Sequence, residues 1–284
     1  MALYSDILLT VDYDRTLTGP DSVIPERNIE AIRHFIDLGG SFTVNTGRSL
    51  PMTNCFRDIV PVNAPLLLYN GSAAYDMEAG KLVNCREIEL DPEPLIRDLE
   101  ARFPKLIVEQ QGTWAHHLFH ENTGWERYCE NCRGPWNYAD PSNVPRPFLK
   151  LAVYGEFRDN TIASMYEATE EDLALFDQAI SYIQEIYGDK VDMFRACARI
   201  LDIHTKGVSK INSARTLQKQ LGKKILVCVG DAENDINMLD GADYAYCPAD
   251  GVVADRYETV CNCADGAVAD VIYKKIPEIL AILP

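Results

Sequence analysis

Two carboxylates stand two positions apart, directly after the first apolar run of the chain. Ile7 to Val11 form that run, and Asp12 and Asp14 follow it. Like charges this close together are costly unless a cation lies between them. A hard cation such as Mg²⁺ prefers oxygen ligands and keeps waters or substrate phosphate as its other ligands. The pair therefore predicts a cation site, although an acidic turn that caps the next element would give the same pattern.

A second polar turn follows the next strand candidate, Ser41 to Val44. It contains Thr46, Gly47 and Arg48. A threonine hydroxyl and the backbone N–H groups after it can hold phosphate oxygens, and glycine permits their close approach. Taken alone, this turn is better explained as an ordinary connection between a strand and a loop.

A lysine opens the helix that the apolar spacing of residues 211–221 predicts. An ammonium group there meets the unfavourable, positive end of the helix dipole. That placement is acceptable for Lys210 if the site holds a phosphate. Lys206 is a nearby competitor, and either lysine could instead be a solvated surface residue.

A fourth polar group follows the strand candidate Ile225 to Val229. Asp231, Asn234 and Asp235 lie in it. They offer a cation more oxygen ligands at another strand end. An N-cap with acidic residues in the first helical turn would also explain them.

The elements that must hold these groups alternate between strand and helix. Short apolar runs at 7–11, 65–69 and 225–229 lack the polar alternation of half-exposed strands, and 41–44 is a further strand candidate. Such runs between helices predict a parallel sheet that is covered on both faces. Sites in such sheets form at the carboxyl ends of the strands, where all four polar groups lie. We therefore expect an α/β fold with a Rossmann-like parallel-sheet core.

The middle of the chain has a different pattern. From about residue 81 to 201 the strand candidates are more polar and alternate, with amphipathic helices such as 170–187 between them, and residues 123–147 look irregular. We predict a discontinuous catalytic core, residues 1–82 and 201–284. An α+β cap domain, residues 83–200, is inserted into it and would determine substrate specificity.

Composition excludes some partners. The 284 residues carry a formal net charge of -16, which argues against nucleic acid or an anionic membrane as partner. The first residues show neither a basic start nor a long apolar stretch, so we expect a cytoplasmic protein. The nine cysteines are expected to be mostly reduced thiols. The oligomeric state is expected to be monomer or homodimer.

The four polar groups together resemble the motifs of the haloacid dehalogenase superfamily of phosphohydrolases. More narrowly, they resemble its Cof-type branch, which carries a large α/β cap after the third core strand. Asp12-x-Asp14-x-Thr16 matches the first motif, and Thr46-Gly47-Arg48 matches the second. The segment 201–210 is similar to the one that holds the third-motif lysine and places it at Lys210, and Gly230 to Asp235 match the fourth motif.

This resemblance implies a role for each matching residue. Asp12 would attack phosphorus and become an aspartyl phosphate. Asp14 would protonate the leaving oxygen and then activate water. Thr46, Gly47, Arg48 and Lys210 would bind the phosphoryl group, and Mg²⁺ would be held by Asp12, Asp14, Asp231, Asn234 and Asp235. The implied protein is a phosphoric monoester hydrolase that acts on a phosphorylated small metabolite, a sugar phosphate being the leading candidate.

One departure from the family pattern leaves alternatives open. Arg15 stands where the family usually has glycine. A sugar phosphomutase of related fold, or a non-catalytic binding protein that kept the fold, are the competing functions. The intact carboxylates and Lys210 count against the non-catalytic one.

The cap region also contains residue types that bind zinc. His116, His117, His120, Cys129 and Cys132 lie close together in the sequence. Cys129 and Cys132 have suitable spacing, but no second clean pair accompanies them. Ordinary cap residues are the favoured interpretation, and a redox role for the two cysteines is the least favoured.

Overall fold

The computed structural model describes residues 3–121, 123–128, 134–155 and 168–282. By the contacts within it, the chain divides into two compact units. Unit 1 consists of Met1–Gly47, Cys55–Val83 and Ser209–Pro284, and unit 2 of Arg48–Asn54 and Asn84–Val208. The chain therefore passes four times between the units, and each unit is described by itself below.

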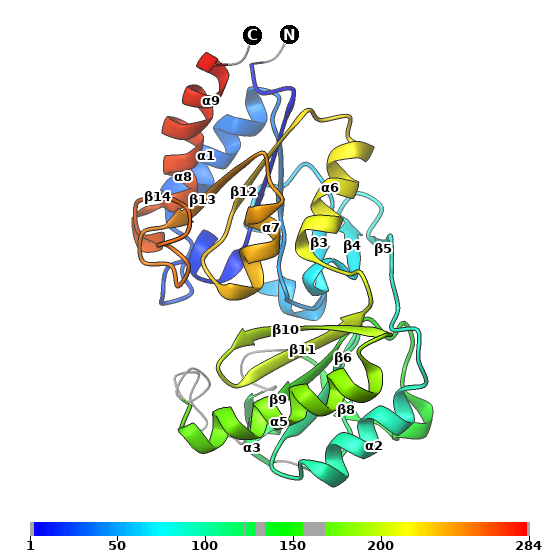
Figure 1. The fold of residues 1–284 in the computed structure, drawn as a ribbon. Coiled ribbons are helices and arrows are strands. Elements are labelled where there is room, and N and C mark those ends of the chain that lie inside the picture. Colours follow the sequence, from blue (N-terminus) through cyan, green and yellow to red (C-terminus); the bar gives the residue numbers. More distant parts are fainter. Residues whose placement is uncertain (1–2, 122, 129–133, 156–167, 283–284) are drawn as a thin grey trace. The chain divides into compact units, whose positions relative to one another are not determined.

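Unit 1 contains a five-stranded parallel sheet of order β14-β13-β12-β1-β2 (Figure 1). Its strands are β1 (Ile7–Val11), β2 (Ser41–Val44), β12 (Ile225–Val229), β13 (Tyr244–Pro248) and β14 (Glu258–Val260). Every residue of β1, β2 and β12 is buried. Burial on both faces explains why β1 and β12 show no polar alternation. The predicted α/β class with a parallel-sheet core is confirmed.

Helices cover both faces of this sheet. Figure 1 shows α6 and α7 on one side and α1, α8 and α9 on the other. Their bounds are α1 (Glu26–Asp37), α6 (Lys210–Gln220), α7 (Ile236–Asp240), α8 (Ala267–Asp270) and α9 (Ile276–Ile282). Helix α1 buries Ile29, Ile32 and Phe35, which share one face at helical spacing. Gly39 follows its end with φ 92°, a conformation that favours glycine.

A small antiparallel sheet completes unit 1. It consists of β3 (Leu66–Leu68), β4 (Ala73–Asp76) and β5 (Lys81–Val83). The run 65–69, which was expected to add a third strand to the parallel sheet, contains β3 and belongs to this antiparallel sheet instead. It meets the end of β2 at a single parallel bridge, Asn45 with Leu67, and then pairs antiparallel with β4. The reversal occurs at Tyr69 to Gly71, where all three φ angles are positive.

Unit 2 contains a six-stranded sheet of order β10-β11-β9-β6-β7-β8. The strands are β6 (Ile107–Gln111), β7 (His116–Leu118), β8 (Trp136–Tyr138), β9 (Leu151–Tyr154), β10 (Val191–Cys197) and β11 (Ile200–Thr205). Neighbours are antiparallel except β7 and β8, which are parallel. Helices α2 (Pro92–Arg102) and α5 (Glu170–Tyr187) pack on one face through Leu99 and Phe176. On the other face, Trp125 of α3 (Thr123–Tyr128) packs against Tyr154.

Two features of unit 2 differ in detail from the sequence patterns. The segment 123–147 is not irregular throughout, because α3 and β8 lie in it. The compact unit also continues to Val208, since β11 pairs with both β9 and β10. The assignment of residues 83–200 to a cap that selects the substrate stays a prediction.

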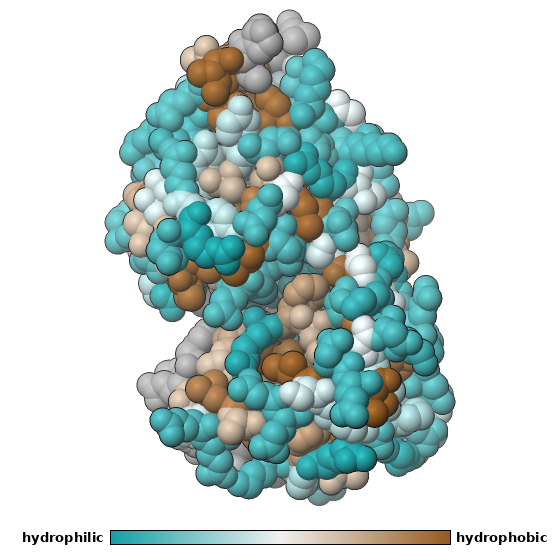
Figure 2. Space-filling view, viewed as in Figure 1, coloured by the Kyte–Doolittle hydropathy of each residue, from teal (hydrophilic) through white to brown (hydrophobic). Residues whose placement is uncertain are grey.

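The visible surface agrees with the acidic, charged composition. Hydrophilic residues cover most of the face drawn in Figure 2, and hydrophobic residues form small groups between them. Among the described residues, no helix is both long enough and apolar enough to cross a membrane.

Candidate active site

The carboxyl ends of three adjacent strands, β12, β1 and β2, bring the predicted residues of unit 1 together. Asp12 follows β1, and its N–H donates to the carbonyl of Val229 at 2.9 Å. Asn45 follows β2, and its N–H donates to the carbonyl of Val11 at 2.8 Å. These bonds extend the parallel ladder by one residue past each strand. The side chains that come next are therefore placed at one edge of the sheet.

A buried lysine joins two of the carboxylates. Lys210 is the first residue of α6, and Ser209 caps that helix by accepting from the N–H of Asn212. The Nζ of Lys210 lies 2.6 Å from Oδ1 of Asp12 and 2.6 Å from Oδ1 of Asp235. Lys210 is 1% exposed and Asp12 6%. The ammonium group thus contacts two buried carboxylates, one from each side of the predicted site.

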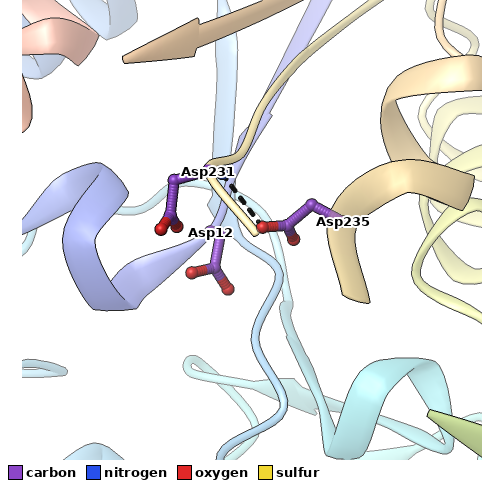
Figure 3. A group of neighbouring side chains, drawn as sticks. All are labelled: Asp12, Asp231 and Asp235. Atoms are coloured by element: carbon purple, nitrogen blue, oxygen red, sulfur yellow. Dashed lines mark hydrogen bonds between the residues drawn. The ribbon is translucent and has the colours of Figure 1, made fainter. Parts of the chain in front are cut away.

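Asp231 and Asp235 are fixed by the turn after β12. The Oδ2 of Asp235 accepts from the N–H groups of Asp231 and Ala232 at 3.1 and 3.2 Å. The Oδ1 of Asp231 accepts from the hydroxyl of Thr16 at 2.8 Å. Figure 3 shows the carboxylates of Asp12, Asp231 and Asp235 gathered around one small volume. One ligand atom from each of the three lies within 4.8 Å of the others.

The electrostatics of this group favour a bound cation. Burial raises the pKa of Asp12 well above its usual range; Lys210 opposes the shift, while Asp235 and Asp231 add to it. Burial and the charge of Asp235 raise the pKa of Asp231 to about 7. Burial alone would lower the pKa of Lys210, but Asp12 and Asp235 outweigh it and raise that pKa. Three carboxylates share one ammonium group, so the donor set fits a hard divalent cation such as Mg²⁺.

Asp14 lies in the turn Tyr13–Leu17 and is half-exposed. Its backbone is extended, and the next residue, Arg15, is left-handed with φ 58° and ψ 10°. Glycine adopts this conformation at no steric cost, whereas other residues pay about 1 kcal/mol or more. The arginine therefore keeps the turn that glycine would form. Its side chain is exposed, and its charge is among the lesser influences that lower the pKa of Asp231.

Thr46 and Gly47 follow β2 in unit 1. Thr46 is buried, and its N–H donates to the carbonyl of Leu67 at 2.9 Å. A Cβ on Gly47 would lie 2.8 Å from Oδ1 of Asn70, so a larger residue cannot fit without a shift. Arg48 is half-buried and belongs to unit 2 by its contacts.

The remaining candidates lie in different settings. Asn234 is half-exposed in the 3-10 turn Glu233–Asp235. Lys206, the competitor of Lys210, belongs to unit 2, and its Nζ pairs with Asp192 at 2.7 Å. Of the two lysines, Lys210 is the one placed among the carboxylates.

Two supporting residues were given no role by the sequence analysis. The hydroxyl of Thr16 orients Asp231, although Thr16 is part of the first motif. The Nδ2 of Asn45 donates to the backbone carbonyl of Lys210 at 2.9 Å and so fixes the start of α6. A local signal existed for Thr16, but the contact of Asn45 joins positions 165 apart and has none.

The residues of the zinc hypothesis have other partners where they are described. His116 bonds Ser49, His117 bonds Asn137, and His120 bonds Glu100. Cys129 and Cys132 lie outside the described residues. Within the described part of the chain, Asp12, Asp231 and Asp235 form the one group with ligand atoms close enough for a metal. The cysteines described there are free thiols: Cys55, Cys85, Cys197, Cys228, Cys247, Cys261 and Cys263.

A parallel sheet with buried carboxylates and a lysine at its carboxyl edge can hold a divalent cation and a phosphoryl group. The chain belongs to the haloacid dehalogenase-like hydrolases, whose family profile matches residues 9–254. The predicted family is therefore confirmed.

Relatives and solved structures agree with this family. The chain is 26% identical over 241 residues to a Streptococcus pyogenes protein that is named as a proposed phosphatase, covering 82% of this chain and 83% of that protein. It is 23% identical to the pyridoxal phosphate phosphatase YbhA of Escherichia coli, covering 95% and 98%. A haloacid dehalogenase-like hydrolase from Bacteroides thetaiotaomicron shares the fold with a TM-score of 0.77 at 16% identity, covering 94% and 98%. These findings confirm the predicted class of enzyme, a phosphatase of this family.

Proposed function

We propose that this protein hydrolyses the phosphate ester of a small phosphorylated metabolite in a Mg²⁺-dependent reaction that passes through an aspartyl phosphate on Asp12. The observation that carries the proposal is the contact of the buried Asp12 carboxylate with Lys210, beside Asp231 and Asp235. A carboxylate nucleophile divides the displacement at phosphorus into two easier steps. Phosphoryl transfer otherwise needs alignment and neutralisation of charge, which this group of residues can supply.

Asp12 and Asp14 of the first motif would carry out both steps. An oxygen of Asp12 forms a bond to phosphorus as the ester bond breaks, and the leaving oxygen takes a proton from Asp14. Asp14 then takes a proton from the water that attacks the aspartyl phosphate, which releases phosphate and restores Asp12. Asp14 is half-exposed in its turn, as a group that exchanges protons with substrate and water must be.

The remaining predicted residues would bind the phosphoryl group and the metal. The phosphoryl oxygens would be held by Thr46, Gly47 and Arg48. The ammonium group of Lys210 would also bind them. Asp12, Asp231 and the backbone carbonyl of Asp14 would ligate Mg²⁺, with Asn234 and Asp235 in support. When bound, Mg²⁺ neutralises charge that develops on the transferring phosphoryl group.

The substrate is proposed as a sugar phosphate or a similar small metabolite. Pyridoxal phosphate joins the candidates because the E. coli relative is named for it. A cytoplasmic location, and a monomer or homodimer that binds neither nucleic acid nor membrane, stay predictions.

The test is release of phosphate from a panel of sugar phosphates, nucleotides, pyridoxal phosphate and an aryl phosphate, with Mg²⁺ or with EDTA. We expect release that needs Mg²⁺ and falls by roughly 10³-fold or more in Asp12→Asn. Isomerisation of a sugar phosphate without release would assign the protein to the mutases instead. No turnover of any ester, together with no effect of Mg²⁺ on thermal unfolding, would contradict the proposal.

A further inference from the structure

Three fully buried side chains of unit 2 form a connected chain outside the group of carboxylates. The Oγ of Ser49 lies 2.7 Å from Nε2 of His116. The Nδ1 of His116 lies 3.1 Å from Oε1 of Glu109, without the alignment of a full hydrogen bond. All three residues belong to unit 2 and have no exposed surface.

Ser49 and Glu109 lie at the two ring nitrogens of His116. The hydroxyl of Ser49 and Nε2 of His116 share a hydrogen bond in which either can donate, and the carboxyl group of Glu109 lies at the other ring nitrogen. The same connectivity activates serine nucleophiles in hydrolases. Here, however, the hydroxyl has no surface open to a substrate. The chain of contacts therefore acts as an anchor rather than as a catalytic triad.

The anchor holds the segment Arg48–Asn54, which belongs to unit 2 although the chain before and after it belongs to unit 1. The segment is braced internally: Thr53 donates through N–H and hydroxyl to the carbonyl of Leu50 at 3.0 and 2.7 Å. The Nη1 of Arg48 reaches the carbonyl of Met52 at 3.5 Å. Ser49 links this braced segment to β7 of the unit 2 sheet.

Arg48 is the residue directly before Ser49, and it directly follows Gly47. Its backbone is thus joined directly to Ser49, which is held by His116 within unit 2. A long arginine side chain loses much conformational freedom when it binds an anion, and fixing its backbone beforehand reduces that loss.

We propose that Glu109, His116 and Ser49 are positioning residues that hold Arg48 ready for the phosphate group of the substrate. The inference rests on the proposed function, because Arg48 is assigned there to phosphate binding. Loss of the anchor should weaken phosphate binding and leave the bond-making residues Asp12 and Asp14 untouched.

The first test compares Ser49→Ala with two substitutions of His116. The amide nitrogen of glutamine lies close to the position of Nε2, whereas that of asparagine lies close to Nδ1. His116→Asn should therefore behave like Ser49→Ala, and His116→Gln should restore most of the wild-type behaviour. For Ser49→Ala and His116→Asn we expect KM for the best ester and Kd for inorganic phosphate to rise about tenfold, with kcat within about threefold.

A matched control lies on the same strand. His117 is also buried and bonds a side chain, Asn137, but it does not bond Ser49. Successive residues of a strand face opposite sides of the sheet, so His117→Gln makes the same chemical change on the other face. It should change neither KM nor the phosphate Kd by more than about twofold.

A double-mutant cycle separates positioning from general destabilisation. Ser49→Ala should raise the phosphate Kd about tenfold in the wild-type background and less than about twofold in the Arg48→Ala background. Equal effects in both backgrounds, or Gln and Asn variants of His116 that cannot be told apart, would overturn the inference.

Inorganic phosphate is used as a probe because its binding needs no turnover. If the wild type hydrolyses no ester but binds phosphate, the proposed function fails while the cycle still decides the inference. If the wild type hydrolyses esters and the cycle shows independent effects, only the inference fails. Failure of the wild type to bind phosphate at all would overturn both.

Discussion

Each unit contains a buried lysine that is paired with carboxylate, and the two pairings differ in charge. In unit 1, Nζ of Lys210 lies 2.6 Å from both Asp12 and Asp235, with Asp231 in the same group. In unit 2, Nζ of Lys150 lies 2.7 Å from Asp202. The first arrangement gathers three carboxylates near one ammonium group, and the second is a buried ion pair in the unit 2 sheet. We therefore expect the carboxylates of unit 1 to bind a cation, and the ion pair of unit 2 to be sensitive to the loss of either partner.

The largest expected effect comes from removing one carboxylate of each arrangement in metal-free protein. Asp202→Asn breaks the buried ion pair with Lys150 and should destabilise unit 2 by about 3–5 kcal/mol. Asp231→Asn removes surplus negative charge, and its Oδ1 can still accept from Thr16, so unit 1 should lose no stability. The second variant should instead lose the stabilisation that Mg²⁺ gives to the wild type.

The three tryptophans provide the measurement. Trp114, Trp125 and Trp136 all lie in unit 2, so urea unfolding followed by their fluorescence reports on that unit. Circular dichroism reports on both units. As a control, Lys150→Met combined with Asp202→Leu should be nearly neutral, because both charges of the ion pair are removed together. A loss of stability in Asp231→Asn as large as in Asp202→Asn would contradict the distinction between the two arrangements.

The second prediction is that unit 2 loses about 3 kcal/mol of stability as pH falls. His204 lies on β11 near Lys150 and Asp202, and burial lowers its pKa to about 4. In the unfolded chain a histidine takes up its proton near pH 6.5. The unfolded state therefore binds more protons between these values, so stability should fall as pH drops from about 6.5 to 4. Urea unfolding by tryptophan fluorescence at several pH values measures this slope.

The variant that isolates this effect is His204→Gln. It should flatten the slope between pH 6.5 and 4, whatever its effect on stability at neutral pH. An unchanged slope would assign the acid sensitivity of unit 2 to other groups.

The smallest effect concerns the turn beside Asp14. Arg15→Gly should raise the stability of unit 1 by about 0.5–1 kcal/mol, because glycine adopts the left-handed backbone without steric cost. Ser22, exposed and with φ 63°, is a matched control in the same unit. Ser22→Gly should give a similar gain in thermal unfolding and leave phosphate release unchanged. A change in KM confined to Arg15→Gly would show that this arginine contacts the substrate; loss of stability in both variants would contradict the argument from strain.

The sequence was sufficient to predict the parallel sheet and the residues at its edge. The buried strands β1 and β12 are mostly apolar runs, and Asp12, Thr46 and Asp231 lie one or two positions after the ends of β1, β2 and β12. The antiparallel pairing of β3 was harder to predict from the sequence. It depends on the chain reversal at Tyr69 to Gly71, where three residues have positive φ and only one of them is glycine.

The contacts that support the predicted residues had little or no local signal. Asn45 reaches the carbonyl of Lys210, and Ser49 reaches His116 across 67 positions of sequence. No periodicity relates residues this far apart, so their pairing follows only from the folded topology. The histidines of unit 2 were considered as zinc ligands for the same reason: residue types alone do not tell which partners the fold supplies.

The topology of unit 1 also sets the order in which the protein can form during synthesis. The central strand β1 pairs with β12, and near it Lys224 bonds Asp6, 218 positions earlier in the chain. At about 5–20 residues per second, the ribosome needs roughly 10–40 s to make this stretch. All of unit 2 has been synthesised by then, because it ends at Val208. The apolar strand β1 can therefore pair with β2 early but must wait for β12, which makes the nascent chain a candidate client for chaperones that cover exposed hydrophobic segments.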